Sequence, residues 1–236
     1  LIALSIFALE NKKVKPKIVQ IVEDTMPKEG LYPKAPELAG ISGYLNTESD
    51  LKISNLKNKV VLIDFWTYSC INCIRTLPFL TEWDRKYRDK GLVIIGVHTP
   101  EFEFEKDINN VKEALGKHNI EYPVVQDNDY ATWSAFKNRY WPRKYLIDAE
   151  GFIRYDHIGE GAYEETERKI QELLAEIGED VTDMDVSKLE DETPSRFNTR
   201  TPELYAGYKF ALPRNQNIGN DEGIQPDQTI TYTLPK

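Results

Sequence analysis

The sequence predicts an α/β fold in which helices pack on a central β-sheet. Apolar, β-branched segments alternate along the chain with segments whose apolar residues recur every three or four positions. This alternation of strands and helices is typical of a layered α/β sandwich. The chain has 236 residues, which is enough for one large domain or for one domain with extensions.

The expected elements follow one another from residue 41 to residue 177. Residues 60–66 (Val-Val-Leu-Ile-Asp-Phe-Trp) are β-branched and aromatic, which indicates a buried strand. Leu77, Leu80 and Trp83 then recur at helical spacing, so a helix is expected over 70–90. The other expected strands are 41–46, 92–98, 122–126, 144–148 and 152–158, and the other expected helices are 104–118, 130–139 and 162–177.

Cys70 and Cys73 are the only two cysteines of the chain, and they stand where a strand ends and a helix begins. Backbone N–H groups at a helix N-terminus favour an anion, so they lower the pKa of a thiol placed there. Cys70 is therefore expected to be the attacking thiolate. Cys73 lies one turn further on and is expected to resolve the mixed disulfide. The pair predicts a thiol-disulfide oxidoreductase.

Two other interpretations of the cysteine pair are weaker. A zinc site needs about four ligands, and the chain adds only three scattered histidines, His98, His118 and His157. A structural disulfide that closes so short a loop would remove little chain entropy. No metal ion and no cofactor are expected.

Asp64 stands six residues before Cys70, inside the apolar strand. Ionising an unpaired carboxyl group in a strand interior is costly, so its pKa should be raised. Such a group could accept the proton of Cys73, directly or through a water. The alternative is an aspartate at a strand edge that faces solvent.

Two prolines are placed where they affect the backbone. Pro78 falls inside the expected helix and should kink it. Trp141-Pro142 comes just before strand 144–148, and an X-Pro bond at the start of a strand can be cis. The sequence by itself leaves the isomer open.

These features together resemble the thioredoxin fold. Asp64-Phe65-Trp66, the Cys-x-x-Cys motif, Pro78 and Trp141-Pro142 occupy the corresponding places. The stretch between the cysteines and Pro142 is longer than in a minimal thioredoxin. Its extra helix and strand, within about 101–126, resemble the TlpA/ResA and peroxiredoxin-like branch. The resemblance implies a three-layer α/β/α sandwich with this helix-strand insertion.

Longer motifs resemble the extracytoplasmic thioredoxin-like part of DipZ-type proteins, over about residues 40–178. DipZ-type proteins fuse a CcdA-like membrane electron carrier to a thioredoxin-like domain, often followed by a β-sandwich similar to carbohydrate-binding modules. The resemblance implies an extracytoplasmic, membrane-tethered enzyme that receives electrons from a CcdA-like donor. Its expected partners are disulfide-containing proteins, and its expected role is that of a reductant in cytochrome c maturation or disulfide handling. The motifs are 65–73, 96–102, 130–133, 138–142 and 145–148.

The resemblance also implies roles for single residues. Cys70 would be the nucleophile, Cys73 the resolving thiol and Asp64 the buried proton acceptor. Pro142 would be the cis-proline that faces the disulfide, and the Trp141 backbone would pair with an extended substrate.

Four residues near the cysteines carry further expectations. Trp66 is expected to line the substrate site. Glu101 is either a second carboxylate near the thiols or part of a solvated loop. The dipeptide Ile71-Asn72 differs from the Gly-Pro of reducing thioredoxins. Because this dipeptide tunes the reduction potential, the direction of electron flow stays open.

The flanks differ in composition from the expected redox domain. The apolar start could be the end of a membrane segment, the end of a signal peptide or a helix docked on the domain, and the resemblance to DipZ-type proteins favours the membrane segment. The lysines just after it favour the cytoplasmic side, against the extracytoplasmic orientation. The expected organisation is a membrane segment or signal over 1–9, a linker over 10–38, the redox domain over 39–178, an acidic linker over 179–200, and over 201–236 the start of a truncated β-rich, carbohydrate-binding-module-like domain.

Other functions fit the sequence less well than that of an oxidoreductase. The net charge of −9 argues against nucleic acid as a partner. A thiol peroxidase is suggested by Thr67, three residues before Cys70 as in peroxiredoxins, but Ile63 replaces their upstream proline. A copper-handling module is suggested because two thiolates suit Cu(I). Relatives that deliver copper, however, usually space their cysteines by three residues and add a histidine.

Overall fold

The computed structural model describes residues 28–181 and 184–189. Within these residues six strands form one sheet, in the order β1-β4-β3-β2-β5-β6. Strands β2, β3 and β4 run parallel, and the remaining neighbours pair antiparallel. The strands are β1 (Gly43–Leu45), β2 (Val60–Trp66), β3 (Leu92–His98), β4 (Val124–Gln126), β5 (Arg143–Ile147) and β6 (Ile153–Ile158).

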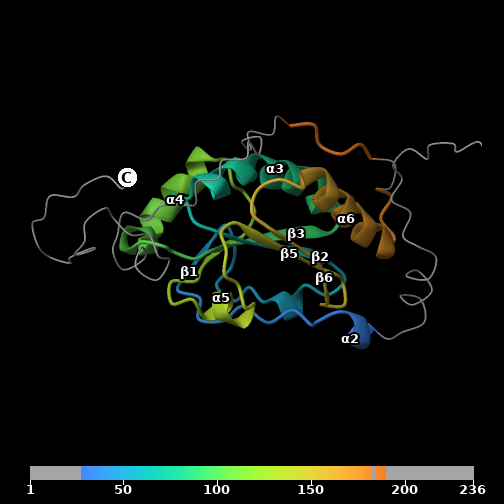
Figure 1. The fold of residues 1–236 in the computed structure, drawn as a ribbon, viewed down its shortest axis with the longest axis horizontal. Helices are drawn as coiled ribbons and strands as arrows, with labels where there is room; N and C mark the ends of the chain where they lie inside the picture. Colours follow the sequence, from blue (N-terminus) through green and yellow to red (C-terminus); the bar gives the residue numbers. More distant parts are fainter. Residues whose placement is uncertain (1–27, 182–183, 190–236) are drawn as a thin grey trace, which may run out of the picture. The chain divides into compact units, whose positions relative to one another are not determined.

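Helices cover both faces of this sheet (Figure 1). One face carries α3 (Ile71–Tyr87), α4 (Ile108–Lys117) and α6 (Tyr163–Glu176), and the other carries α2 (Lys28–Leu31) and α5 (Ala131–Ala135). Two separate clusters of buried apolar side chains fill the spaces between the layers. The predicted three-layer α/β/α sandwich is therefore confirmed. Short 3₁₀ turns at Ile53–Asn55, Arg88–Lys90 and Glu103–Lys106 complete the described elements.

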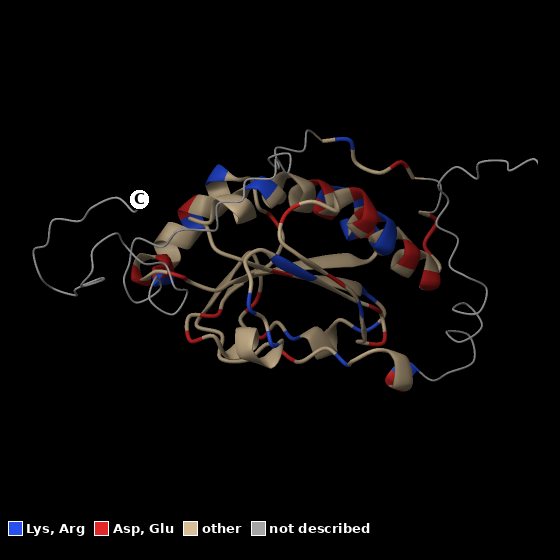
Figure 2. Cartoon of the chain, in the orientation of Figure 1, with Lys and Arg blue, Asp and Glu red and all other residues tan. Residues whose placement is uncertain are grey.

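Strands β2 and β3, in the middle of the sheet, have the predicted bounds, whereas β4 begins two residues later than expected and β5 is shifted by one residue. Every residue of β2 is buried, and β2 pairs along its length with β3 and β5. A strand covered on both faces is a continuous apolar run rather than an alternating one. Charged residues accordingly lie mostly on the helices and connecting segments (Figure 2).

The insertion contains the predicted helix and strand, but its helical part is divided differently. The expected helix 104–118 is a 3₁₀ turn, Glu103–Lys106, followed by α4. The two are separate because Asp107 has an extended backbone and its side chain accepts a hydrogen bond from the Asn109 N–H, which caps α4. The strand of the insertion, β4, lies between β3 and β1.

Residues 28–38, expected to belong to a linker, pack against the domain in the structure. Lys34 forms an isolated β-bridge with Phe152, and Ala35 and Leu38 pack on the second core cluster. The segment is held because its apolar side chains cover sheet surface that would otherwise face water.

The start of the expected acidic linker is also packed. Val181 is fully buried, and the Ser187 N–H and hydroxyl both donate to Glu167 of α6. The expected membrane or signal segment, 1–9, and the expected β-rich start, 201–236, lie outside the described residues. In the part of the chain that the structure describes, every helix is too short or too polar to cross a membrane.

Candidate active site

The two cysteines lie at the junction of β2 and α3. Cys70 is the N-cap residue of α3, with an extended backbone, and its carbonyl accepts the Ile74 N–H at 3.0 Å. Cys73 follows in the first turn of the helix. The Cys73 side chain is fully buried, whereas Cys70 is only partly buried. Neither thiol is bonded to another residue in the structure.

The surroundings of the two thiols shift their pKa values in opposite directions. A hydrogen bond from the Cys73 thiol lowers the pKa of Cys70, the backbone N–H groups of Cys73 and Asn72 lower it further, and partial burial opposes them. Burial raises the pKa of Cys73 well above its ordinary value, and the bond to Cys70 raises it further. At neutral pH the accessible thiol is therefore the one more readily ionised.

Asp64 lies in the central strand below the cysteines, and its side chain is fully buried. The alternative of a solvent-facing aspartate is thus excluded. The neighbouring strand places Lys144 opposite Asp64, with its Nζ 3.5 Å from Asp64 Oδ1. Burial raises the pKa of Asp64 to about 6, although the charge of Lys144 opposes this shift. The charge of Asp64 in turn raises the pKa of Cys73, so the two groups interact electrostatically.

The sequence by itself does not indicate that Lys144 belongs to the site. It is itself almost fully buried, at 1% exposure. The sequence shows only that a lysine stands at the start of an otherwise apolar strand. Only the β2–β5 register shows that this lysine faces Asp64.

The Trp141-Pro142 peptide bond is cis. Pro142 is buried directly before β5, and its carbonyl accepts the Gly159 N–H at 2.8 Å. Trp141 is partly exposed, its indole N–H donates to the Thr99 carbonyl at 3.1 Å, and it packs on the same apolar cluster as Cys70. These contacts bring the predicted substrate-binding residues Trp141 and Pro142 to the cysteine end of the sheet.

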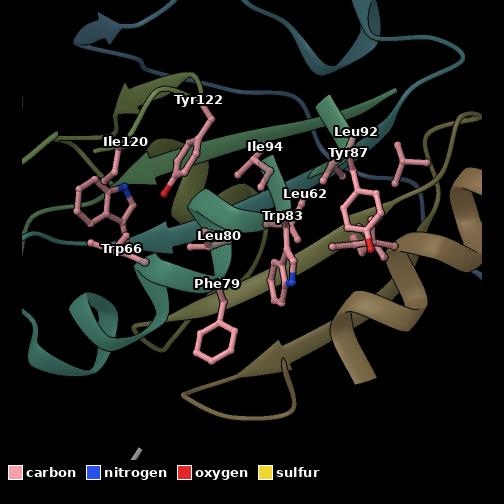
Figure 3. Close-up of a cluster of buried hydrophobic side chains, with 14 of the residues drawn as sticks. Leu62, Trp66, Phe79, Leu80, Trp83, Tyr87, Leu92, Ile94, Ile120 and Tyr122 are labelled. Carbon is pink, nitrogen blue, oxygen red and sulfur yellow. The ribbon is translucent and has the colours of Figure 1, made fainter. Parts of the chain in front are cut away.

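Trp66 differs from its expected role. Its side chain is fully buried, and its Nε1 and the Tyr122 ring both line the space beside Gly96. Figure 3 shows its ring inside the cluster of buried side chains, with the indole nitrogen turned toward the Tyr122 hydroxyl. Because the side chain has no exposed surface, Trp66 supports the site from within the core and offers a substrate no side-chain contact.

A second carboxylate, Glu105, is buried next to residues 67–70, which connect β2 to α3 and are called the cysteine loop here. It accepts the Ser69 hydroxyl at 2.5 Å and the backbone N–H groups of Glu101 and Phe102 at 2.5 and 2.9 Å. Burial opposes ionisation of Glu105, but hydrogen bonds from Ser69, Thr67 and the two backbone N–H groups outweigh it and lower its pKa. No pattern in the sequence distinguishes Glu105 from the other acids around it. The acid that was considered, Glu101, is exposed, and its charge raises the pKa of Cys70.

His98, the last residue of β3, contacts the cysteine loop through Tyr68. Its Nε2 accepts the Tyr68 N–H at 3.3 Å, and its ring stacks on Tyr68 at 5.5 Å. Burial lowers the pKa of His98 to about 4, so the ring is neutral at pH 7. Across residues 28–181 and 184–189, no three His, Cys, Asp or Glu side chains are grouped so that they could hold a metal ion.

A Cys-x-x-Cys pair at a helix N-terminus, which follows a central strand that carries a buried aspartate, is typical of a thioredoxin-like thiol-disulfide oxidoreductase. Residues 32–174 match the Redoxin family, and the chain belongs to this family. It is similar to DipZ of Mycobacterium tuberculosis (strain CDC 1551 / Oshkosh), with 46% identity over 193 residues that cover 80% of this chain. The match spans only 28% of the length of DipZ.

Two further comparisons cover nearly whole relatives. The thiol-disulfide oxidoreductase YkuV of Bacillus subtilis (strain 168) is 34% identical over 141 residues, which are 60% of this chain and 94% of YkuV. The solution structure of a thioredoxin-like protein in the oxidized form superimposes with a TM-score of 0.57 at 34% identity, over 62% of this chain and 97% of that one. These relatives support the enzyme class that the site defines.

Proposed function

We propose that this domain reduces disulfides in other proteins, with Cys70 as nucleophile and Cys73 as resolving thiol. The difference between the two thiols carries the proposal: Cys70 is accessible with a lowered pKa, and Cys73 is fully buried with a raised pKa. An attacking thiol must be accessible and ionised. A resolving thiol needs only to reach its neighbour one helical turn away.

The reaction transfers two electrons in two exchange steps. The Cys70 thiolate attacks one sulfur of the substrate disulfide, forms a mixed disulfide and releases the other sulfur as a thiolate. Cys73 then loses its proton and attacks the Cys70 sulfur, which releases the second substrate thiolate. The substrate gains two electrons, and the domain is left with a Cys70–Cys73 disulfide.

Asp64 is proposed to receive the proton of Cys73, directly or through a water. With a pKa of about 6 it is mostly ionised at pH 7 and can accept a proton, whereas an ordinary aspartate would be a weaker base. Lys144, 3.5 Å away, keeps the buried carboxylate from being neutralised outright.

The substrate is proposed to lie along the cis-proline segment as an added strand. Pairing with the Trp141 backbone would place a substrate disulfide over Cys70. The Pro142 carbonyl already accepts the Gly159 N–H, so the pairing is assigned to Trp141.

The setting of the reaction is also a proposal. The 46% identity to DipZ supports a membrane-tethered, extracytoplasmic enzyme. In this setting a CcdA-like carrier would supply electrons, and disulfide-containing proteins such as apocytochrome c would be the targets. Thr67 is buried, with its hydroxyl 3.4 Å from His98 Nε2, so its placement gives no separate support to a peroxidase.

Two measurements test this proposal. Cys70→Ser should abolish reduction of a protein disulfide, while Cys73→Ser should accumulate a mixed disulfide through Cys70 that mass spectrometry detects. Unchanged activity in Cys70→Ser would exclude the mechanism. The reduction potential of the pair tests the direction: a value near about −270 mV identifies a reductant, and one near about −120 mV identifies an oxidant.

A further inference from the structure

We propose that Phe102 and Phe104 form a docking platform for the substrate polypeptide. The platform would take an apolar side chain close to the target disulfide, in a segment that also carries lysine or arginine. This inference rests on the proposed function, because it supplies the site with a second contact to the same substrate.

The two phenylalanines are exposed together. Phe102 is 50% exposed and Phe104 is 54% exposed, and their rings stack at 5.4 Å between centroids with 6° between their planes. Phe104 also lies 6.2 Å from the Tyr68 ring. Adjacent large apolar side chains at the surface commonly mark an interaction site.

The platform adjoins the cysteine loop and the cis-proline. The Tyr68 hydroxyl donates to the Phe104 carbonyl at 3.1 Å, and the Trp141 indole donates to the Thr99 carbonyl at 3.1 Å. Residues 99–104 therefore contact Tyr68, two residues before Cys70, and Trp141, next to the cis-proline. A substrate chain that pairs with Trp141 can continue over it.

The backbone beneath the platform is held in one conformation. Glu105 is fully buried and accepts the N–H groups of Glu101 and Phe102, and its other oxygen accepts the Ser69 hydroxyl. Asn110 also donates to the Phe104 carbonyl, at 2.9 Å. A surface that is already ordered loses little entropy when a partner binds.

The charge around the platform selects the partner. Residues 101–107 contain four acids and one lysine. Glu101, Glu103 and Asp107 are exposed, and Lys106 is ion-paired to Glu103 at 2.8 Å. Cationic residues next to the apolar side chain of a substrate would be attracted to this surface, whereas acidic ones would be repelled.

The test compares substrates on the whole chain. Two disulfide-linked peptides are used, identical except that one has Phe-Lys and the other Ser-Glu beside the cysteine, and hydroxyethyl disulfide serves as a substrate too small to reach the platform. In Phe102→Ser/Phe104→Ser, the ratio of kcat/KM for the Phe-Lys peptide to that for hydroxyethyl disulfide should fall about tenfold, mainly through KM. Leu189→Ser, which removes another exposed apolar side chain from the separate segment 184–189, should leave the ratio unchanged.

A charge reversal provides a second variant that keeps both phenylalanines. Glu103→Lys should lower kcat/KM for the Phe-Lys peptide and raise it for the Ser-Glu peptide. Unchanged ratios in both variants would overturn the platform, as would a change in oligomeric state with no change in the ratios, which would assign the patch to self-association. If the unaltered chain reduces none of the three disulfides, the proposed function itself fails; if it reduces all three equally well, only the platform fails.

Discussion

The two buried carboxylates beside the cysteines, Asp64 and Glu105, behave in opposite ways. Both side chains are fully buried. Asp64 faces one lysine at 3.5 Å and has its pKa raised to about 6, whereas Glu105 accepts several short hydrogen bonds and has its pKa lowered. Burial alone therefore does not decide whether a carboxyl group titrates near neutral pH. The number of donors that face the charged form decides it.

The different pKa values of Asp64 and Glu105 suit the two carboxyl groups to different roles. Asp64 can gain and lose a proton near physiological pH, so it can serve proton transfer at Cys73. Glu105 remains ionised and holds the cysteine loop and the Phe102–Phe104 segment together through fixed hydrogen bonds. Substitution of each group should consequently affect a different property of the enzyme.

Asp64→Asn should give the largest effect on catalysis. Removing the proton acceptor of Cys73 should lower the rate of product release roughly 100-fold, the lower end of the range for acid–base catalysis. The measurement is single-turnover release of reduced product from the mixed disulfide. The pH profile of this step should also lose its dependence on a group with a pKa of about 6. If the rate and profile are unaltered, Asp64 has no part in proton transfer.

The stability of the domain should depend on Asp64 with a definite sign. Its folded-state pKa of about 6 lies above the ordinary 3.8, so the associated stability is complete below pH 3.8 and lost as the pH rises through 6. The unaltered protein should lose about 2 kcal/mol of unfolding free energy relative to Asp64→Asn between pH 4 and pH 7. Urea denaturation at several pH values measures this, and a difference that stays flat would contradict the raised pKa.

Glu105→Gln should mainly affect stability. The amide replaces one acceptor with a donor that faces backbone N–H groups, which should cost between about 1 and 2 kcal/mol. Because the Glu105 pKa is lowered, its contribution is present above the ordinary value of 4.5 and lost at lower pH, so the deficit should shrink in acid. Glu103→Gln, in the same turn but exposed, is the matched control and should change stability by less than about 0.5 kcal/mol. Equal losses of stability in Glu105→Gln and Glu103→Gln would show that the hydrogen bonds of Glu105 do not stabilise the cysteine loop.

Lys144→Met should give the smallest and most specific effect. Lys144 lowers the pKa of Asp64, so its removal should move the midpoint of the pH–rate profile upward from about 6. The profile should keep its shape, since Asp64 is still present. A midpoint that does not move would show that Lys144 has no influence on the proton acceptor.

Local features were predictable because they depend on neighbours in the chain. The unbroken apolar runs of β2 and β3 indicated buried strands, and both were found at the predicted residues. The spacing of Cys70 and Cys73 at a strand-helix junction indicated their redox role without knowledge of any distant contact. Asp64 could be recognised because a carboxyl group inside an apolar strand is costly wherever that strand packs.

The features that the sequence does not show depend on how the chain packs, and most of them join residues far apart in the chain. Lys144 meets Asp64 through the β2–β5 register, across 80 positions. Trp66 ends the same strand as Asp64, and only the packing of β3 and β4 beside it shows that its indole is enclosed. Glu105 stands in an acidic run that predicted solvation, and one of those acids turns inward because Ser69 and two backbone N–H groups offer it donors.

The sequence by itself determined the α/β architecture, the position of two thiols at a strand-helix junction and a carboxyl group with a raised pKa, because periodicity, spacing and the cost of burying charge act locally. Only the tertiary structure decided which lysine accompanies Asp64, which glutamate is buried at the cysteine loop, that Trp66 is enclosed and that the Trp141-Pro142 bond is cis. Those outcomes depend on contacts between hydrogen-bond donors, rings and strands that the fold brings together. Patterns within one segment of the sequence do not show which of these groups come into contact.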